Sequence, residues 1–350
     1  MILGKTRVCG QNCRAAVCGW TLVMLMPAGP AGAAVWTPDH VVIVIEENLS
    51  SHNLVPQLTY LSGLLRENAN FTNSHAVDHP SQPNLSGTVF GRCARHRFGC
   101  KAETRRLQPD RRCHTQVGTD DPLANTPLDT PNLGAGLIDA GRSFAGYSED
   151  LPSPGFTGTS HTGPAGSGID YQRKHNPWVN WQALNDYALG RNQLPSTVNL
   201  PFAAFPNDDA GFARLPTVAF VVPNQIDDAH ESSAASPGTN YGKVMDDWLR
   251  LHIEPYRRWA MTHNSLLIVT WDEDEDAYSP VKDIRGTIVG KRYINLIPTI
   301  MAGQGVVPGS YSERIDHYSV LRTIVDFYGL TPLAHGDAGA APITDAFHQP

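Results

Sequence analysis

Acidic side chains directly follow two apolar stretches of this sequence. The stretch "VVIVIEEN" ends in Glu46, Glu47 and Asn48. The stretch "SLLIVTWDEDED" ends in consecutive acids, of which Asp272 and Glu273 come first. Carboxylates that converge cannot all stay ionised without a counter-charge, and oxygen ligands suit a hard divalent cation. If the two stretches end side by side, the sequence predicts a metal site there. The acidic run taken alone also fits a solvated loop.

A serine in "HPSQPN" could act as a nucleophile beside such a metal. Ser81 lies between Pro80 and Pro83, which favour an exposed turn. Serine is a weak nucleophile at its ordinary pKa, and coordination to a metal ion activates it without a neighbouring base. The following "NLSGTVFG" could begin a helix, whose N-terminal N–H groups would favour an anion such as phosphate. Taken alone, the motif also fits an ordinary turn.

Four histidines could act on a phosphate group, and most of them lie where turns or strand ends are expected. They are His79, His175, His230 and His317. An imidazolium group stabilises negative charge that develops on phosphate oxygens, and it can protonate a leaving alkoxide. Each of these histidines, considered alone, could equally have a structural role.

An alternation of strands and helices in the sequence would position these candidate residues. Apolar runs at 40–48, 216–224 and 265–271 are typical of parallel strands that are buried on both faces. The stretch 131–150 predicts a helix, a glycine stop and then a strand. Helical spacing also occurs at 243–263, where Pro255 predicts a kink. A strand at 294–303 and an amphipathic helix at 318–330 complete the pattern. We expect an α/β fold with a mainly parallel central sheet flanked by helices, which gathers strand ends at one edge.

Two segments lack any hydrophobic periodicity. Residues 152–168 and 276–292 are rich in glycine, serine, proline or charge, and we expect both to be loops.

The first 33 residues have the features of a secretory signal peptide. Basic residues precede a short apolar stretch at 15–26, and an A-x-A motif follows at 31–33. We expect residues 1–33 to be removed and residues 34–350 to form a single domain. The protein would be secreted to the periplasm or outside the cell, with no stable membrane insertion after cleavage. An uncleaved anchor is the alternative.

Charge and cysteine content narrow the choice of partners. The formal net charge is −7, and removal of the basic leader would make it more negative, so we expect no nucleic-acid partner. The segment 92–113 is a basic excursion that holds Cys93, Cys100 and Cys113. We expect two of these cysteines to pair in an oxidising compartment, and which two stays open. The excursion could steer anions or be a solvated loop.

Seven motifs resemble, in the same order, those of the phosphoesterase family, and in particular its short secreted acid phosphatases. They are "VVIVIEEN", "HPSQPN", "YSEDLP", "KHNPWVNW", "FVVPNQIDDAH", "SLLIVTWDEDED" and "HYSVLRTIVDFYGL". The resemblance extends from about residue 40 to 345 and implies an alkaline phosphatase-like α/β fold. Departures from the family pattern after "HPSQPN" and after "NQIDDAH" leave the choice of substrate open.

The resemblance implies a metal centre and a covalent mechanism. Glu47 and Asn48 match the metal ligands that end the first strand, and Asp272 and Glu273 match the acidic pair that completes the site. Ser81 matches the nucleophile, which also binds the metal and becomes a phosphoserine. One divalent ion is implied, and the ligand types allow calcium, magnesium, manganese or zinc.

The resemblance also implies contacts to the phosphate group. His175 and His230 match histidines that surround it. His79 is a further catalytic contact, and Asn84 is a further substrate contact. His317 is assigned to substrate binding as well, although it could instead brace the site.

Three functions are consistent with these features. The first is a secreted metal-dependent acid phosphatase that hydrolyses phosphate monoesters, which could be small molecules or phosphoinositide or other lipid head groups. The second is a phosphodiesterase of the phospholipase C type with the same catalytic residues. The third is a non-enzymatic secreted binding protein in which calcium stabilises the acidic cluster. We expect the first, a phosphoric monoester hydrolase.

Overall fold

A computed structural model provides the framework for the predicted residues. It describes residues 36–49, 58–77, 81–82, 84–85, 127–163, 170–230, 241–274, 278–282, 284–285, 287–333 and 335–348. The predicted signal peptide at 1–33 and the cysteine-containing excursion at 92–113 lie outside these residues. Among the described helices, none is both long enough and apolar enough to cross a membrane.

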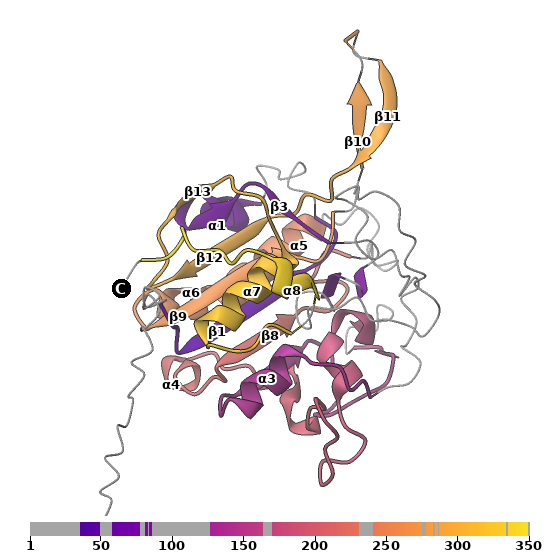
Figure 1. Ribbon diagram of the computed structural model, residues 1–350, viewed down its shortest axis with the longest axis vertical. Coiled ribbons are helices and arrows are strands. Elements are labelled where there is room, and N and C mark those ends of the chain that lie inside the picture. The colour runs from indigo at the N-terminus through magenta and orange to yellow at the C-terminus, as the bar shows by residue number, and fades with distance from the viewer. Residues whose placement is uncertain are drawn as a thin grey trace, which may run out of the picture. The chain divides into compact units, whose positions relative to one another are not determined.

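An eight-stranded sheet has the strand order β13-β2-β12-β9-β1-β8-β4-β7 (Figure 1). Its strands are β1 (His40–Glu46), β2 (Ala69–Phe71), β4 (Phe144–Ser148), β7 (Asn199–Pro201), β8 (Val218–Val222), β9 (Ser265–Trp271), β12 (Thr299–Gly303) and β13 (Gly309–Tyr311). Strand β1 pairs in parallel with both β8 and β9, and β4 pairs in parallel with β7 and β8. Only β12 runs antiparallel to its neighbours in this sheet. The predicted mainly parallel α/β sheet is confirmed.

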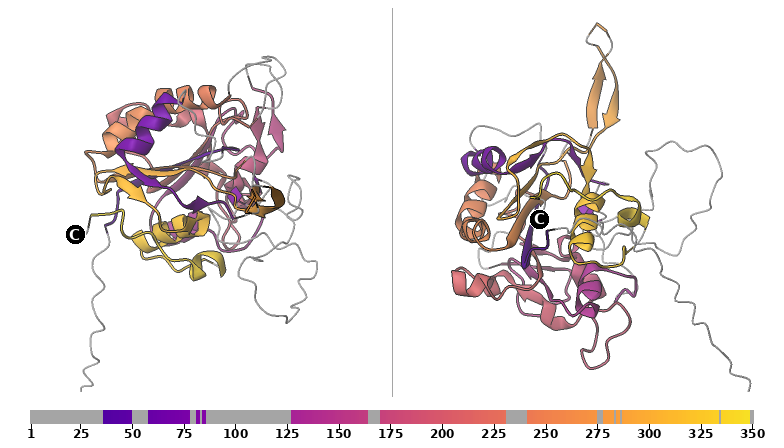
Figure 2. Two further views of the ribbon diagram at one scale, coloured as in Figure 1. Left: turned by 90° about the horizontal axis from the view of Figure 1, so that it is seen from above. Right: turned by 60° about the vertical axis from the view of Figure 1, so that its left-hand side comes forward.

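Helices cover both faces of the sheet (Figure 2). Val42 and Val44 of β1 face one core with helices α1, α4, α5 and α6, whereas Val41 and Ile43 face a second core with α3 and α7. This two-sided burial explains why the central strands read as continuous apolar runs. The α-helices are α1 (Thr59–Glu67), α3 (Leu133–Asp139), α4 (Asp209–Phe212), α5 (Tyr241–Trp248), α6 (Glu254–Ala260), α7 (His317–Phe327) and α8 (His335–Gly339).

Shorter elements connect these layers. The 3-10 helices are η2 (Arg173–His175), η3 (Pro177–Trp181), η4 (Ser196–Val198) and η5 (Phe202–Ala204). Strand β3 (Ser74–His75) pairs with β14 (Ile315–Asp316), and β5 (Ser160–His161) pairs with β6 (Tyr171–Gln172).

The helical stretch at 243–263 deviates as Pro255 predicts. Helix α5 ends at Trp248, a π-helical turn spans Leu249–Ile253, and α6 begins at Glu254 with the proline in its first turn. Proline lacks an N–H to donate to the preceding turn, so the helix cannot run through this point with regular hydrogen bonds.

The prediction of a loop at 276–292 is wrong. Residues Tyr278–Lys282 form β10 and Ile288–Tyr293 form β11, which pair with each other in an antiparallel hairpin (Figure 1). The segment 152–168 likewise contains the short strand β5. Periodicity fails here because these ribbons pair through their backbones and have no face on the main core, so their sequences need not alternate.

Candidate active site

The ends of strands β1 and β9 are tied together. The Asp272 N–H donates to the Glu46 carbonyl oxygen (2.9 Å), and the Asn48 N–H donates to Asp272 Oδ1 (3.3 Å). Asn48 has a φ of 54°, in the left-handed region that asparagine tolerates better than most residues. The two acid-ended stretches therefore meet at one edge of the sheet, as their parallel pairing requires.

Two buried carboxylates contact the serine hydroxyl, and a third lies beside them. Ser81 Oγ lies 3.2 Å from Glu47 Oε2 and 3.2 Å from Glu273 Oε1. Glu47, Asp272 and Glu273 each offer an oxygen atom within 4.8 Å of the others. Serine is only 2% exposed and the acids are no more than 3% exposed, so water screens their charges little. The structure thus brings together Ser81 with all three acids that the sequence assigned to the metal site.

The electrostatics of this group fit a cation. Burial and the charge of Glu273 raise the pKa of Glu47 to about 8. Burial, together with Glu47 and Glu273, raises the pKa of Asp272 well above its usual range. Asp272 Oδ2 is enclosed and has no hydrogen-bond partner among the described residues. Buried carboxylate oxygens without enough donors are the ligands that a hard divalent ion requires. Asn48 is half-buried next to them.

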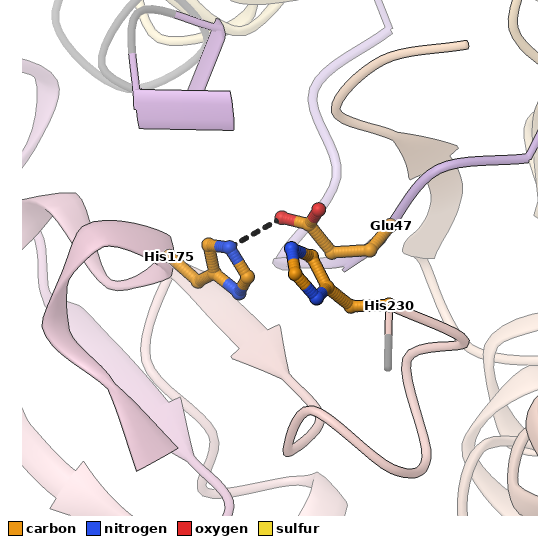
Figure 3. Close-up of side chains that lie close together, drawn as sticks. All are labelled: Glu47, His175 and His230. Atoms are coloured by element: carbon orange, nitrogen blue, oxygen red, sulfur yellow. Dashed lines mark ion pairs between the residues drawn. The ribbon is translucent and has the colours of Figure 1, made fainter. Parts of the chain in front are cut away.

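Two histidines face the other side of Glu47 (Figure 3). His175 Nε2 lies 2.9 Å from Glu47 Oε1, and the rings of His175 and His230 are 5.4 Å apart between centroids. Glu47, His175 and His230 form a second group whose ligand atoms lie within 4.8 Å of one another. The sequence predicted that these histidines contact phosphate. The geometry also permits a cation here, because imidazole nitrogen is a common metal ligand.

Sequence reasoning missed the residues that orient His175. Gln225 Nε2 donates to His175 Nδ1 (2.8 Å), so the ring proton on Nε2 points to Glu47. Asp228 Oδ2 lies 3.6 Å from the same Nδ1, and the Asp228 carbonyl accepts the Glu47 N–H (3.1 Å). Burial raises the pKa of Asp228 to about 7. The sequence offered one signal for Asp228, which is its position two residues before His230. Carboxylates often orient catalytic imidazoles.

The remaining predicted residues have supporting contacts. Asn84 is fully buried, and its Oδ1 accepts the Val77 N–H (3.0 Å) in the segment that leads to the serine. His317 begins α7, and its Nε2 lies 2.9 Å from the Trp271 carbonyl oxygen at the end of β9. Burial lowers the pKa of His317, which favours its neutral form. This contact is the one expected if His317 braces the site, and its role in substrate binding stays a prediction.

The segment around the nucleophile is described in part. Ser81, Gln82, Asn84 and Leu85 are helical, whereas most of the helix that was expected at 84–91 lies outside the described residues. His79 lies outside the described residues, and its predicted role is untested.

A second group of acids, which the sequence did not predict, lies next to the group around Ser81. It consists of Glu46, Glu149, Asp227 and Asp228. Glu46 is fully buried, and neither of its carboxylate oxygens has a hydrogen-bond partner among the described residues. Burial and the nearby Asp228, Asp227 and Glu149 raise its pKa well above the usual range. Burial and Asp227 also raise the pKa of Glu149 to about 8, although the Asn224 N–H and Trp248 Nε1 donate to it. We expect Glu46 to be neutral.

Comparison with known proteins gives the family. The Phosphoesterase family matches residues 55–331. A phosphatidylinositol-3-phosphatase of Mycobacterium tuberculosis is 36% identical over 319 residues, which are 91% of this chain and 85% of that protein. An acid phosphatase of Aspergillus fumigatus is 28% identical over 275 residues, 77% of this chain, and the chain spans 50% of that longer relative.

A solved structure supports the fold. An alkaline phosphatase superfamily protein from Vibrio parahaemolyticus superposes with a TM-score of 0.50 at 12% identity, and covers 84% of this chain and 67% of its own. At this identity the likeness concerns architecture alone, and it confirms the alkaline phosphatase-like fold. The matched family model and the 36%-identical relative show that the chain belongs, as its motifs predicted, to the Phosphoesterase family.

Proposed function

We propose that the chain is a secreted, metal-dependent acid phosphatase that hydrolyses phosphate monoesters through a phosphoserine intermediate. The observation that carries this proposal is the position of the Ser81 hydroxyl, 3.2 Å from oxygen atoms of both Glu47 and Glu273. A hydroxyl with a purely structural role gains nothing from a position among several buried carboxylates. A nucleophilic hydroxyl does gain from it, because it would bind the same cation as the carboxylates.

The metal would be held by the oxygen atoms of Glu47, Asp272 and Glu273, with the Asn48 side chain as a further candidate. When bound, a divalent cation lowers the pKa of a coordinated hydroxyl and neutralises developing charge. Calcium, magnesium, manganese and zinc all suit some of these ligands, and add-back after chelation identifies the one that the enzyme uses.

The side chains divide the remaining chemistry between them. Ser81 Oγ would pass its proton to Glu47 or Glu273, whose oxygen atoms it contacts, and would form a bond to phosphorus while the bond from phosphorus to the ester oxygen breaks. The leaving alkoxide takes a proton. His175 would position Glu47, with Gln225 holding the His175 ring in place, and a protonated His230 would neutralise the phosphoryl oxygens or supply that proton. Water then attacks the phosphoserine, which releases phosphate and restores the hydroxyl.

Relatives support the substrate class. The names phosphatidylinositol-3-phosphatase and acid phosphatase both describe enzymes that act on phosphate monoesters. We infer that this chain has the same class of substrate, either small or on a lipid head group. Secretion rests on the leader-like features of residues 1–33, and N-terminal sequencing of the exported protein tests it.

A panel of phosphate esters tests the activity. Wild-type protein should hydrolyse aryl phosphate, should lose this activity with a chelator and should regain it with one divalent metal. Ser81→Ala should lower kcat at least about 1,000-fold, since a nucleophile and its activation are removed together. Ser74→Ala is a matched control, because Ser74 is also buried but its hydroxyl hydrogen-bonds to the Thr299 hydroxyl (2.7 Å) instead of to the acids around Ser81.

Two outcomes would contradict the proposal. Substantial turnover by Ser81→Ala, with Ser74→Ala equally active, would refute the assignment of Ser81 as the nucleophile. Faster hydrolysis of phosphatidylcholine or another diester than of any monoester would instead indicate a phosphodiesterase of the phospholipase C type.

A further inference from the structure

The β10–β11 hairpin is the least explained feature of the fold. Its strands pair only with each other in the described structure, and it extends away from the eight-stranded sheet (Figures 1 and 2). An isolated two-stranded ribbon buries little and stabilises a protein little. We therefore expect the hairpin to have a function other than stabilising the core.

The base of the hairpin is fixed at the candidate active site. The chain enters β10 soon after Asp274 and leaves β11 just before Asn295, and the Asp274 N–H donates to Asn295 Oδ1 (2.8 Å). Asn295 is buried, and its carbonyl accepts the Ala76 N–H (2.9 Å), in the segment that leads to Ser81. A partner that binds the hairpin would therefore lie close to the Ser81 nucleophile.

The hairpin exposes two isoleucines, Ile284 in its turn and Ile288 at the start of β11. Ile284 is 103% exposed and Ile288 is 61% exposed. The turn sequence includes Asp283 and Gly286, which are usual turn residues, but a β-branched aliphatic residue such as Ile284 has no advantage there in water. Two isoleucines at the end of a projecting ribbon are suited to enter an apolar phase.

The charge of the segment indicates which phase. Residues 278–293 contain Lys282, Arg285, Lys291 and Arg292 against one acid, Asp283, in a chain whose formal net charge is −7. Basic residues beside exposed aliphatic ones are typical of segments that bind anionic lipid surfaces, where each cation strengthens binding about fivefold.

We propose that the β10–β11 hairpin docks the protein onto anionic phospholipid membranes, with Ile284 and Ile288 entering the lipid interface. Docking itself is independent of catalysis. Its consequence, that lipid head-group phosphates are brought to Ser81, rests on the proposed function.

Vesicle binding by the full chain tests the proposal. We would measure co-sedimentation with vesicles of phosphatidylcholine alone and with added phosphatidylserine. Wild-type protein should bind the anionic vesicles at least tenfold more tightly than the neutral ones. The double variant Ile284→Asp with Ile288→Asp should lose at least tenfold of that affinity, and its hydrolysis of a soluble aryl phosphate should be unchanged.

A matched control comes from another exposed apolar loop. Leu184 and Tyr187 are 87% and 99% exposed, outside the hairpin. Leu184→Asp with Tyr187→Asp should leave vesicle binding unchanged, which separates a hairpin effect from general loss of surface hydrophobicity.

The failures are distinguishable. Equal vesicle binding by wild type and hairpin variant, or no binding by wild type, would overturn docking even if aryl phosphate is hydrolysed. A hairpin variant that changes only the oligomeric state in gel filtration would overturn docking and assign the hairpin to self-association. Vesicle binding without hydrolysis of any phosphate ester would leave docking intact and overturn the proposed function.

Discussion

Metal binding to the candidate site should release protons, because its carboxylates are buried together. The pKa of Glu47 without metal is raised to about 8 by burial and by Glu273. At pH 6 this group is about 99% protonated, and removal of its proton costs ~3 kcal/mol at ~1.4 kcal/mol per pH unit. A cation needs the carboxylate, so the metal Kd should fall about tenfold per pH unit between pH 6 and 8 from Glu47 alone. The raised pKa of Asp272 makes the dependence steeper.

Calorimetry of metal-stripped protein measures this directly. Titrations at pH 6, 7 and 8, each in two buffers of different ionisation enthalpy, give both the Kd and the number of protons released. We expect at least one proton per metal at pH 6 and fewer at pH 8. Glu47→Gln should bind metal more weakly and should release about one proton fewer, since its amide has none to lose.

The control variant is Glu149→Gln, because Glu149 also has a pKa of about 8 but lies outside the group around Ser81. It should leave the proton count unchanged. A Kd that stays constant from pH 6 to 8, together with heats that do not depend on the buffer, would refute the claim that these carboxylates are protonated without metal and ionised with it.

Three further results are expected. Glu149 has its pKa raised from 4.5 to about 8 in the folded protein, so it contributes stability below pH 4.5 that is lost as pH rises to about 8. Relative to Glu149→Gln, the wild-type free energy of unfolding should fall by ~2 kcal/mol in urea titrations between pH 5 and 8, less than the full shift implies because the side chain is partly exposed; equal slopes would contradict this. Gly146→Ala should lower the free energy of unfolding by ~2 kcal/mol or more, because its Cβ would lie 2.1 Å from the buried Trp178 ring. Gly136→Ala should not destabilise the protein, because its Cβ would lie 3.8 Å from the Leu333 side chain; comparable melting temperatures of the two variants would argue against this packing. His175→Asn should lower kcat on aryl phosphate about 100-fold while the metal Kd changes less than threefold, and a large loss of metal affinity would assign His175 to metal binding instead.

The parts of the fold that were predictable are those that share the core. Strands β1, β8 and β9 are buried on both faces, so packing alone forces their sequences to be apolar and β-branched. The end of α3 was also predictable from the sequence, because the backbone turns there with a φ of 72° at Gly141, a conformation that favours glycine. The β10–β11 hairpin left no comparable signal, since backbone pairing without a core face places little demand on side chains.

The site was predictable to the extent that topology gathers strand ends. Glu47 and Asp272 follow adjacent parallel strands, so their meeting follows from the sheet alone. Ser81 could not be placed beside them by such reasoning, and its assignment came from the resemblance. Gln225 and His175 are 50 residues apart and meet only because the turn after β8 folds against η2, which no local pattern announces.

The neighbouring acids Glu46 and Glu47 show why a count of carboxylates does not predict a site's charge. Side chains alternate along β1, and Val42 and Val44 face the core that contains α5, so Glu46 turns to that side, where Trp248 donates to Glu149. Glu47 follows the last strand residue and turns to Ser81 instead. The first acid is buried without a donor among the described residues, and its raised pKa keeps it neutral. The oxygen atoms arranged to bind a cation are those of Glu47, Asp272 and Glu273 around the nucleophile, although the sequence presents Glu46 and Glu47 as equals.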